Sequence, residues 1–170
     1  MVLIPMVRDA VSIPLIAAGG IASGRSMLAA EILGAEGSQV GSRFAASEES
    51  SAHENFKTKI TETDEGQTML AMKQLIPVRL LKNKFFEKIT EAELRGASKN
   101  ELIEILGSRR AKRGIFEGDL EEGELEIGQV AAVVKKIQAA KVIVDEIWDE
   151  YWQARASMCS EIQRKMTMAS

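Results

Sequence analysis

The sequence is poor in the residues that build disulfides, metal centres and imidazole or thiol catalysis. Its 170 residues include one cysteine, Cys159, and one histidine, His53. A lone cysteine cannot form an intramolecular disulfide, and a reduced, cytoplasmic setting is the expectation. No Cys/His set for zinc can be assembled. No P-loop is present either, because no Gly-Lys-Ser/Thr accompanies the spacing of Gly20 and Gly24.

The sequence also lacks a long apolar run and a dominant charge. No stretch approaches the roughly 18–20 apolar residues that span a bilayer, and Arg8 and Asp9 interrupt the apolar N-terminus too early for a signal peptide. With 22 Lys and Arg against 25 Asp and Glu, the net charge is −3. Neither nucleic acid nor a membrane is therefore expected as a partner. Length and a 45% hydrophobic content indicate one globular domain with a core.

Two short segments near the start predict neighbouring strands. Residues 13–18, Ile-Pro-Leu-Ile-Ala-Ala, form a continuous apolar run that predicts a strand buried on both faces, and it ends at Gly19-Gly20. A helix over residues 25–33 stops at Gly34, and a second strand over 38–40 ends at Gly41. This order predicts a parallel β/α unit. Parallel sheets are normally covered on both faces, and two strands alone cannot form such a sheet. Partner strands outside this sequence are therefore expected.

The glycine turns after these two strands are candidates for binding an anion. Glycine lets backbone N–H groups approach a ligand closely, because no Cβ intervenes. The helix after Gly19-Gly20 is expected to add its free N-terminal amides, and Ser42 adds a hydroxyl donor after Gly41. Loops after strands 7 and 8 of a (β/α)₈ barrel often hold phosphate in this way. The alternative is that the glycines only allow tight turns and close helix packing.

Beyond residue 47 the sequence predicts helices joined by polar turns. A helix is expected over residues 50–60, and capping boxes at Thr90 and Ser98 predict two more helix starts. A long helix is predicted over residues 129–151, and a break or kink near Ala139 is left open as the alternative to a continuous helix. The resulting division is barrel units over 1–48, a helical subdomain over 49–127, closing helices over 128–152 and a tail over 153–170.

The motifs at the two turns resemble a known family. Ile16-Ala-Ala-Gly-Gly-Ile-Ala-Ser-Gly-Arg25, Leu33-Gly-Ala-Glu-Gly37 and Val40-Gly-Ser-Arg-Phe44 are similar to the strand 7 and strand 8 signature of nitronate monooxygenases, formerly called 2-nitropropane dioxygenases. The family usually has threonine where this chain has Ser42. The resemblance continues through Val78–Asn83 and Gly118–Gly123 to Gly128-Gln129. A close relative with the same layout is the FMN-dependent enoyl-acyl-carrier-protein reductase.

The resemblance implies an α/β fold, the C-terminal portion of an FMN-binding (β/α)₈ TIM barrel with strands 7 and 8, followed by a mainly helical segment. It implies a flavoprotein in which the FMN phosphate is bound mainly through backbone groups. A flavin-side or substrate-side role is assigned to Gln129; the alternative is that Gln129 is an ordinary residue at a helix N-terminus. The implied cofactor-binding residues are Ala18, Gly19, Gly20, Gly41, Ser42 and Gln129.

No catalytic residue is assigned, because the resemblance places the family's histidine in a Gly-Gly-His-type loop that this sequence lacks. His53 is expected to be a solvated or capping residue. The carboxylates of Asp119, Glu121, Glu122 and Glu124 do not match an EF-hand loop and are interpreted as a solvated loop. The basic residues 109–113 are interpreted as a solvated face, with pairing to those acids or to an acidic partner as the alternative.

Three functional interpretations remain open at this point. The first is a monooxygenase that oxidises alkyl nitronates with O₂, to which this chain contributes the FMN phosphate site but not the catalytic half. The second is the enoyl-acyl-carrier-protein reductase, which consumes NAD(P)H. The third is a non-catalytic truncated fragment that associates, with itself or a partner, through an exposed barrel edge. Replacing Gly20 or Gly41 by valine is expected to abolish flavin retention under the first two.

Overall fold

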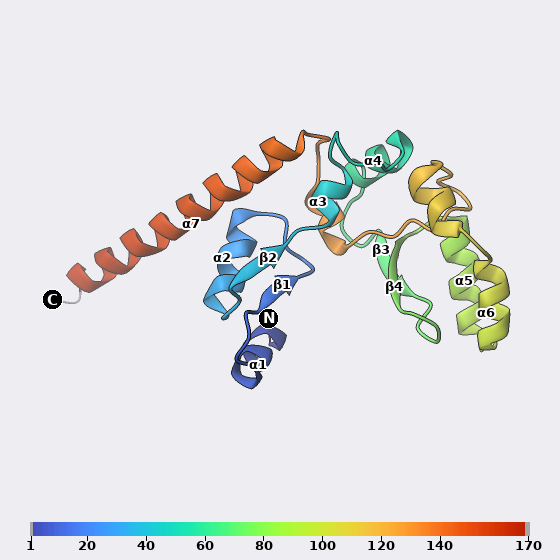
Figure 1. Ribbon diagram of the computed structural model, residues 1–170, viewed down its shortest axis with the longest axis horizontal. Coiled ribbons are helices and arrows are strands. Elements are labelled where there is room, and N and C mark those ends of the chain that lie inside the picture. Colours follow the sequence, from blue (N-terminus) through green and yellow to red (C-terminus); the bar gives the residue numbers. More distant parts are fainter. Residues whose placement is uncertain (1, 169–170) are drawn as a thin grey trace. The chain divides into compact units, whose positions relative to one another are not determined.

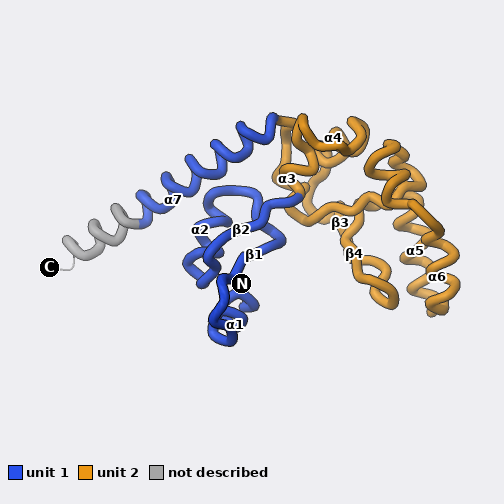
Figure 2. The backbone as a smooth tube through the Cα atoms, in the orientation of Figure 1, with its two compact units in different colours: residues 1–41, 139–170 blue, residues 42–138 orange. Residues whose placement is uncertain are grey.

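The computed structural model describes the backbone of residues 2–168 and the side chains of residues 2–158 (Figure 1). The chain forms two compact units, residues 1–41 with 139–170 and residues 42–138 (Figure 2). Cys159, on which the expectation of no intramolecular disulfide rests, lies outside the described side chains. No helix in the described part of the chain is long and apolar enough to cross a membrane.

The first unit contains the predicted β/α arrangement. Its elements are α1 (Leu3–Ala10), β1 (Ile16–Ala18), α2 (Gly24–Ile32), β2 (Gly37–Gln39) and α7 (Ala140–Met168). The strands β1 and β2 pair in parallel, which confirms the prediction. The first strand is shorter than expected and begins two residues after Pro14, since proline has no N–H to donate to a neighbouring strand.

The strand β1 is buried on one face only, so the prediction of burial on both faces is wrong within this chain. Ala17 is buried and joins Ile21, Ala30 and Ala35 in a small core. Ile16, on the other face, is 55% exposed. The described strand β2 is the only neighbour of β1 in its sheet. The apolar run that suggested two-sided burial therefore leaves part of its surface uncovered.

The second unit contains a β-hairpin that the sequence analysis did not predict, so the expectation of helices alone beyond residue 47 is wrong. Strands β3 (Thr68–Ala71) and β4 (Val78–Leu81) pair antiparallel. Successive residues of β4 are fully buried in two separate clusters, Leu80 beside Phe85 and Leu81 beside Phe56. The hairpin therefore organises the core of this unit. Its helical elements are α3 (Ser42–Ala45), α4 (Glu54–Thr61), α5 (Lys84–Leu94), α6 (Lys99–Leu106), η1 (Lys112–Phe116) and η2 (Gln129–Val133).

One of the two predicted capping boxes is a helix start. Ser98 caps α6, and its side chain accepts a hydrogen bond from the Glu101 amide. Thr90 instead lies inside α5, where its hydroxyl donates to the Phe86 carbonyl at 2.7 Å. The true cap of α5 is Asn83, whose side chain accepts from the Phe86 amide at 2.9 Å. A Thr-x-x-Glu pattern inside a helix thus mimics a start signal.

The long helix predicted over residues 129–151 is two separate elements. The 3₁₀ helix η2 spans Gln129–Val133, and α7 begins at Ala140. The continuous helix is therefore wrong and the alternative of a break near Ala139 is the observed one; the boundary between the two compact units falls there. The apolar residues before the break serve the second unit, since Ala131 and Val134 are buried in its core.

Candidate functional site

The parallel register brings the two glycine turns to the same edge of the β1–β2 sheet. Ala18, the last residue of β1, pairs with Gln39, the last residue of β2. Gly19-Gly20 and Val40-Gly41 therefore both leave the sheet at its carboxyl end. This is the edge at which ligands bind in parallel α/β sheets.

Backbone conformation explains two of the three glycines but not the third. Gly19 and Gly20 have φ of +91° and +74°, a region that L side chains rarely adopt. Gly41 has no such φ, and no atom lies within 4 Å of the position that a Cβ on Gly41 would take. Neither local conformation nor packing within this chain requires glycine at position 41. Open space above a glycine at this edge fits the close approach of a ligand.

Several amides at the two turns have no partner in the described part of the chain. No backbone hydrogen bond is recorded from the N–H groups of Gly20, Ile21, Gly41 or Ser42. Backbone donors normally find an acceptor in the protein or in solvent. Phosphate oxygens are acceptors that such turn amides can bind. The residues present therefore fit an anionic group such as the phosphate of FMN.

The N-terminus of α2 offers fewer free amides than expected, so that expectation is wrong in part. Ser23 caps the helix and shares reciprocal hydrogen bonds with Ser26. The first helical amide, of Gly24, donates to Oε2 of Glu150 at 2.9 Å. The Glu150 carboxylate, carried by α7, thus occupies the position at which an anion is favoured by the helix dipole. No sequence signal pointed to Glu150, which is 126 positions away.

Ser42 and Gln129 lie in one cluster of the second unit. The Ser42 Oγ accepts a hydrogen bond from the Gly128 amide at 3.3 Å, which leaves the hydroxyl proton for another acceptor. A Cβ on Gly128 would lie 2.9 Å from that Oγ. Gln129 is exposed and opens η2 directly after Gly128. Ser42 itself begins the one-turn helix α3, which the sequence analysis did not predict.

His53 is a helix cap, as expected. It precedes α4, and its Nδ1 accepts a hydrogen bond from the Asn55 amide at 3.1 Å. The imidazole lies against Gly118, where a Cβ would come within 2.3 Å of Nδ1. These contacts give His53 a structural role at the start of α4.

The acidic and basic segments pair with each other, so the interpretation of both as solvated surfaces is wrong in part. Arg113 forms an ion pair with Asp119 at 2.5 Å. Arg110 is 20% exposed, donates to the Leu106 and Glu122 carbonyls, and lies over the Phe85 ring. Asp119 accepts from two loop amides, and these bonds lower the pKa of its carboxyl. No group of three or more possible metal ligands occurs among the described residues.

Glu124 is not part of a solvated loop, because it is 7% exposed. Burial, and then the neighbouring Glu126 carboxylate, raise the pKa of Glu124 from 4.5 to about 7. A carboxyl with a raised pKa is protonated more readily in the folded chain than in the unfolded one. The stability contributed by the protonated form is fully present below about pH 4.5 and is lost as the pH rises to about 7.

We expect replacement of Glu124 by glutamine to remove the loss of folding stability that accompanies the rise in pH. The wild-type free energy of unfolding should fall between pH 5 and pH 8 by up to about 3 kcal/mol relative to the variant. Urea unfolding at the two pH values measures the difference. The control is Glu104→Gln, which removes an exposed carboxylate from α6 and should leave the wild-type slope intact. Equal slopes in wild type and Glu124→Gln would contradict the role of Glu124.

Comparison with known proteins gives the family. A family model described as nitronate monooxygenase matches residues 1–150. A probable nitronate monooxygenase of Staphylococcus saprophyticus is 39% identical over 94 residues, covering 54% of this chain and 26% of that protein. FabK from Thermotoga maritima superposes with a TM-score of 0.87 at 38% identity, covering 94% of this chain and 51% of that chain.

A more distant solved relative has the same fold. Nitroalkane oxidase from Streptomyces ansochromogenes superposes with a TM-score of 0.76 at 29% identity, covering 92% of this chain and 44% of that chain. The chain thus spans about half the length of these solved relatives, and its match covers about a quarter of the curated one. Because the family model matches most of its length, the chain belongs to the nitronate monooxygenase family.

Proposed function

We propose that this chain provides the FMN phosphate site of an oxidoreductase that oxidises alkyl nitronates with O₂. The observation that carries the proposal is Gly41, a glycine that neither its backbone conformation nor any neighbouring atom explains. It lies at the sheet edge where the free amides of Gly20 and Ile21 also occur. A phosphate that approaches this edge accounts for the glycine at position 41 and for the free amides of Gly20 and Ile21.

Each proposed residue contributes a backbone group or a hydroxyl. Ala18, Gly19 and Gly20 line the phosphate from the first turn, and the amides of Gly41 and Ser42 donate from the second. The Ser42 hydroxyl adds a further donor, since its oxygen already accepts from Gly128. Gln129 is proposed as a flavin-side or substrate-side contact. Bound FMN supplies the redox chemistry.

The proposed architecture is that of strands 7 and 8 of a (β/α)₈ barrel, represented by β1 and β2. Phosphate sites of such barrels use the loops after these strands and a short extra helix. The one-turn helix α3 follows β2 directly and supports this assignment. In this proposal, turnover requires the family's Gly-Gly-His-type loop, since the only histidine of this chain caps α4. We propose no catalytic residue within the chain.

The second candidate is the enoyl-acyl-carrier-protein reductase reaction, in which NAD(P)H is consumed. The observation that favours it is the likeness to FabK, an FMN enoyl-acyl-carrier-protein reductase, with a TM-score of 0.87 against 0.76 for the nitroalkane oxidase. Both candidates require the same phosphate site. The third, of a different class, is a non-catalytic chain that associates through its exposed barrel edge. Ile13, which precedes β1, and Ile16, the first residue of β1, are 67% and 55% exposed.

The test uses the purified chain titrated with FMN and with riboflavin. Phosphate recognition predicts that FMN binds and that riboflavin, which lacks the phosphate, binds at least about tenfold more weakly. O₂ consumption with an alkyl nitronate and NAD(P)H oxidation with an enoyl thioester are then assayed. Equal affinity for the two flavins would reject the phosphate site. Turnover by this chain alone would reject the requirement for the missing histidine loop.

Ser42→Ala provides a finer test of the hydroxyl donor. We expect FMN affinity to fall about three- to tenfold, because one hydrogen bond to a charged phosphate is lost. Ser42→Thr keeps the hydroxyl and should bind FMN like the wild type. Riboflavin affinity should be the same in all three proteins. If FMN affinity fell as much in Ser42→Thr as in Ser42→Ala, a role for the hydroxyl would be contradicted.

A further inference from the structure

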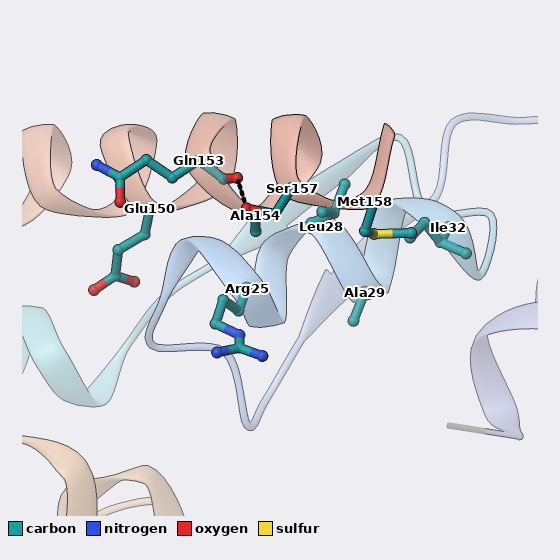
Figure 3. Close-up of a pocket in the computed structure, with 9 residues that line it drawn as sticks. All are labelled: Arg25, Leu28, Ala29, Ile32, Glu150, Gln153, Ala154, Ser157 and Met158. Carbon is teal, nitrogen blue, oxygen red and sulfur yellow. Dashed lines mark hydrogen bonds between the residues drawn. The ribbon is translucent and has the colours of Figure 1, made fainter. Parts of the chain in front are cut away.

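A groove of about 520 Å³ lies between α2 and α7, within the first unit (Figure 3). Its volume falls within the range of small-molecule sites. Its apolar lining comes from both helices: Leu28, Ala29 and Ile32 from α2, and Ala154 and Met158 from α7. The lining residues beyond position 150 lie outside the stretch that the family model matches. The groove therefore includes a part of the chain that the family description does not cover.

The two ends of the groove differ in polarity. Arg25, Glu150 and Gln153 line one end, and Ile32 and Met158 lie together at the other (Figure 3). Arg25 and Ile32 are seven residues apart on α2, which corresponds to about 10 Å along a helix. A ligand that fills this groove has a polar group at one end and a short apolar chain at the other.

The sign of the ligand's charge follows from the partners of the two charged residues. The Glu150 carboxylate already accepts from the Gly24 amide at the N-terminus of α2. The Arg25 guanidinium is exposed and makes no recorded hydrogen bond or ion pair with any residue that the structure describes. Guanidinium groups bind carboxylates through two parallel hydrogen bonds. Glu150 keeps its negative charge but is engaged by the Gly24 amide, so the charged group that remains without a partner among the described residues at this end is the Arg25 cation, which favours an anion.

We propose that the groove between α2 and α7 binds a small amphipathic carboxylate, an acyl chain of medium length with its carboxylate on Arg25. The chain runs along Leu28 and Ala29 toward Ile32 and Met158. None of the groove residues belongs to the turns proposed to hold the flavin phosphate. The two sites are separate, so either can fail without the other.

Isothermal titration of the full chain with octanoate tests the proposal. Octanol carries the same chain without the charge, and acetate carries the charge without the chain. We expect octanoate to bind saturably and at least about tenfold more tightly than either, because it uses both ends of the groove. Octanol binding as tightly as octanoate, or no saturable binding of octanoate, would overturn the proposal.

Two charge variants should shift octanoate affinity in opposite directions. Arg25→Gln removes the cation without breaking a recorded contact, and we expect octanoate to bind about tenfold more weakly while octanol is unaffected. Glu150→Gln keeps an oxygen for the Gly24 amide but removes a negative charge from the same end. Octanoate should then bind about two- to threefold more tightly.

A steric variant and a matched control complete the test. Ala29→Trp fills the middle of the groove from an exposed helix position and should weaken both octanoate and octanol by at least about tenfold. Lys99→Gln makes the same charge change as Arg25→Gln on the exposed surface of α6 and should leave binding unchanged. Equal weakening by Lys99→Gln and Arg25→Gln would show a general charge effect and reject the groove.

Discussion

Replacing Gly41 with valine is expected to abolish flavin retention while leaving the chain folded. A phosphate oxygen must come within about 2.9 Å of a backbone nitrogen to accept its hydrogen bond. A branched side chain at position 41 would fill the open space above the turn. Loss of two or more hydrogen bonds to a charged group weakens FMN binding by at least about 100-fold. FMN titration followed by flavin fluorescence measures the loss.

The backbone at Gly41 makes this substitution more informative than the one at Gly20. Gly20 has φ of +74°, so valine there strains the turn whether or not a ligand binds. Gly41→Val meets no atom within 4 Å at its Cβ and should unfold at the wild-type urea concentration. Riboflavin affinity serves as the control, since it does not depend on phosphate. If Gly41→Val binds FMN as tightly as the wild type does, the second turn does not bind the phosphate.

The local β/α unit could be predicted because its signals are short-range. The apolar run before Gly19, the helix stop at Gly34 and the glycine after β2 each act within a few residues. The β3–β4 hairpin could not be predicted in the same way. Its strands have four residues each, and β4 is apolar on both faces because Leu80 and Leu81 enter different clusters. Such a segment lacks the alternation that marks a half-buried strand.

The candidate site could be predicted only in part, because contacts between distant parts of the chain decide which of its groups are free. Glycine turns indicate where an anion can approach, but not which amides remain free. The Gly24 amide is taken by Glu150, which comes from a helix at the other end of the chain. The buried Glu124 likewise looked like one of several loop acids. Its burial depends on a fold that brings distant elements around it, which no local spacing encodes.

Replacing Gly24 with alanine is expected to disrupt the packing of the first unit, because α2 and α7 approach each other closely at this residue. A Cβ on Gly24 would lie 2.0 Å from the Tyr151 backbone nitrogen and 2.3 Å from the Ile147 carbonyl oxygen. Both atoms belong to the α7 backbone, so no side-chain rotation relieves the overlap and the helices must move apart. Alanine in place of a helical glycine otherwise stabilises by up to about 1 kcal/mol.

Overpacking against a rigid backbone outweighs that gain, and we expect Gly24→Ala to destabilise the first unit by about 3 kcal/mol. The two tryptophans of the chain, Trp148 and Trp152, both lie on α7, so tryptophan fluorescence reports this unit specifically. Urea unfolding followed by fluorescence should shift in Gly24→Ala and not in the matched Gly41→Ala, where the added methyl meets no atom. Equal midpoints for the two variants would mean that α2 and α7 do not approach through Gly24. A shift confined to Gly24→Ala would instead identify this glycine as the point at which the C-terminal helix is held against the β/α unit.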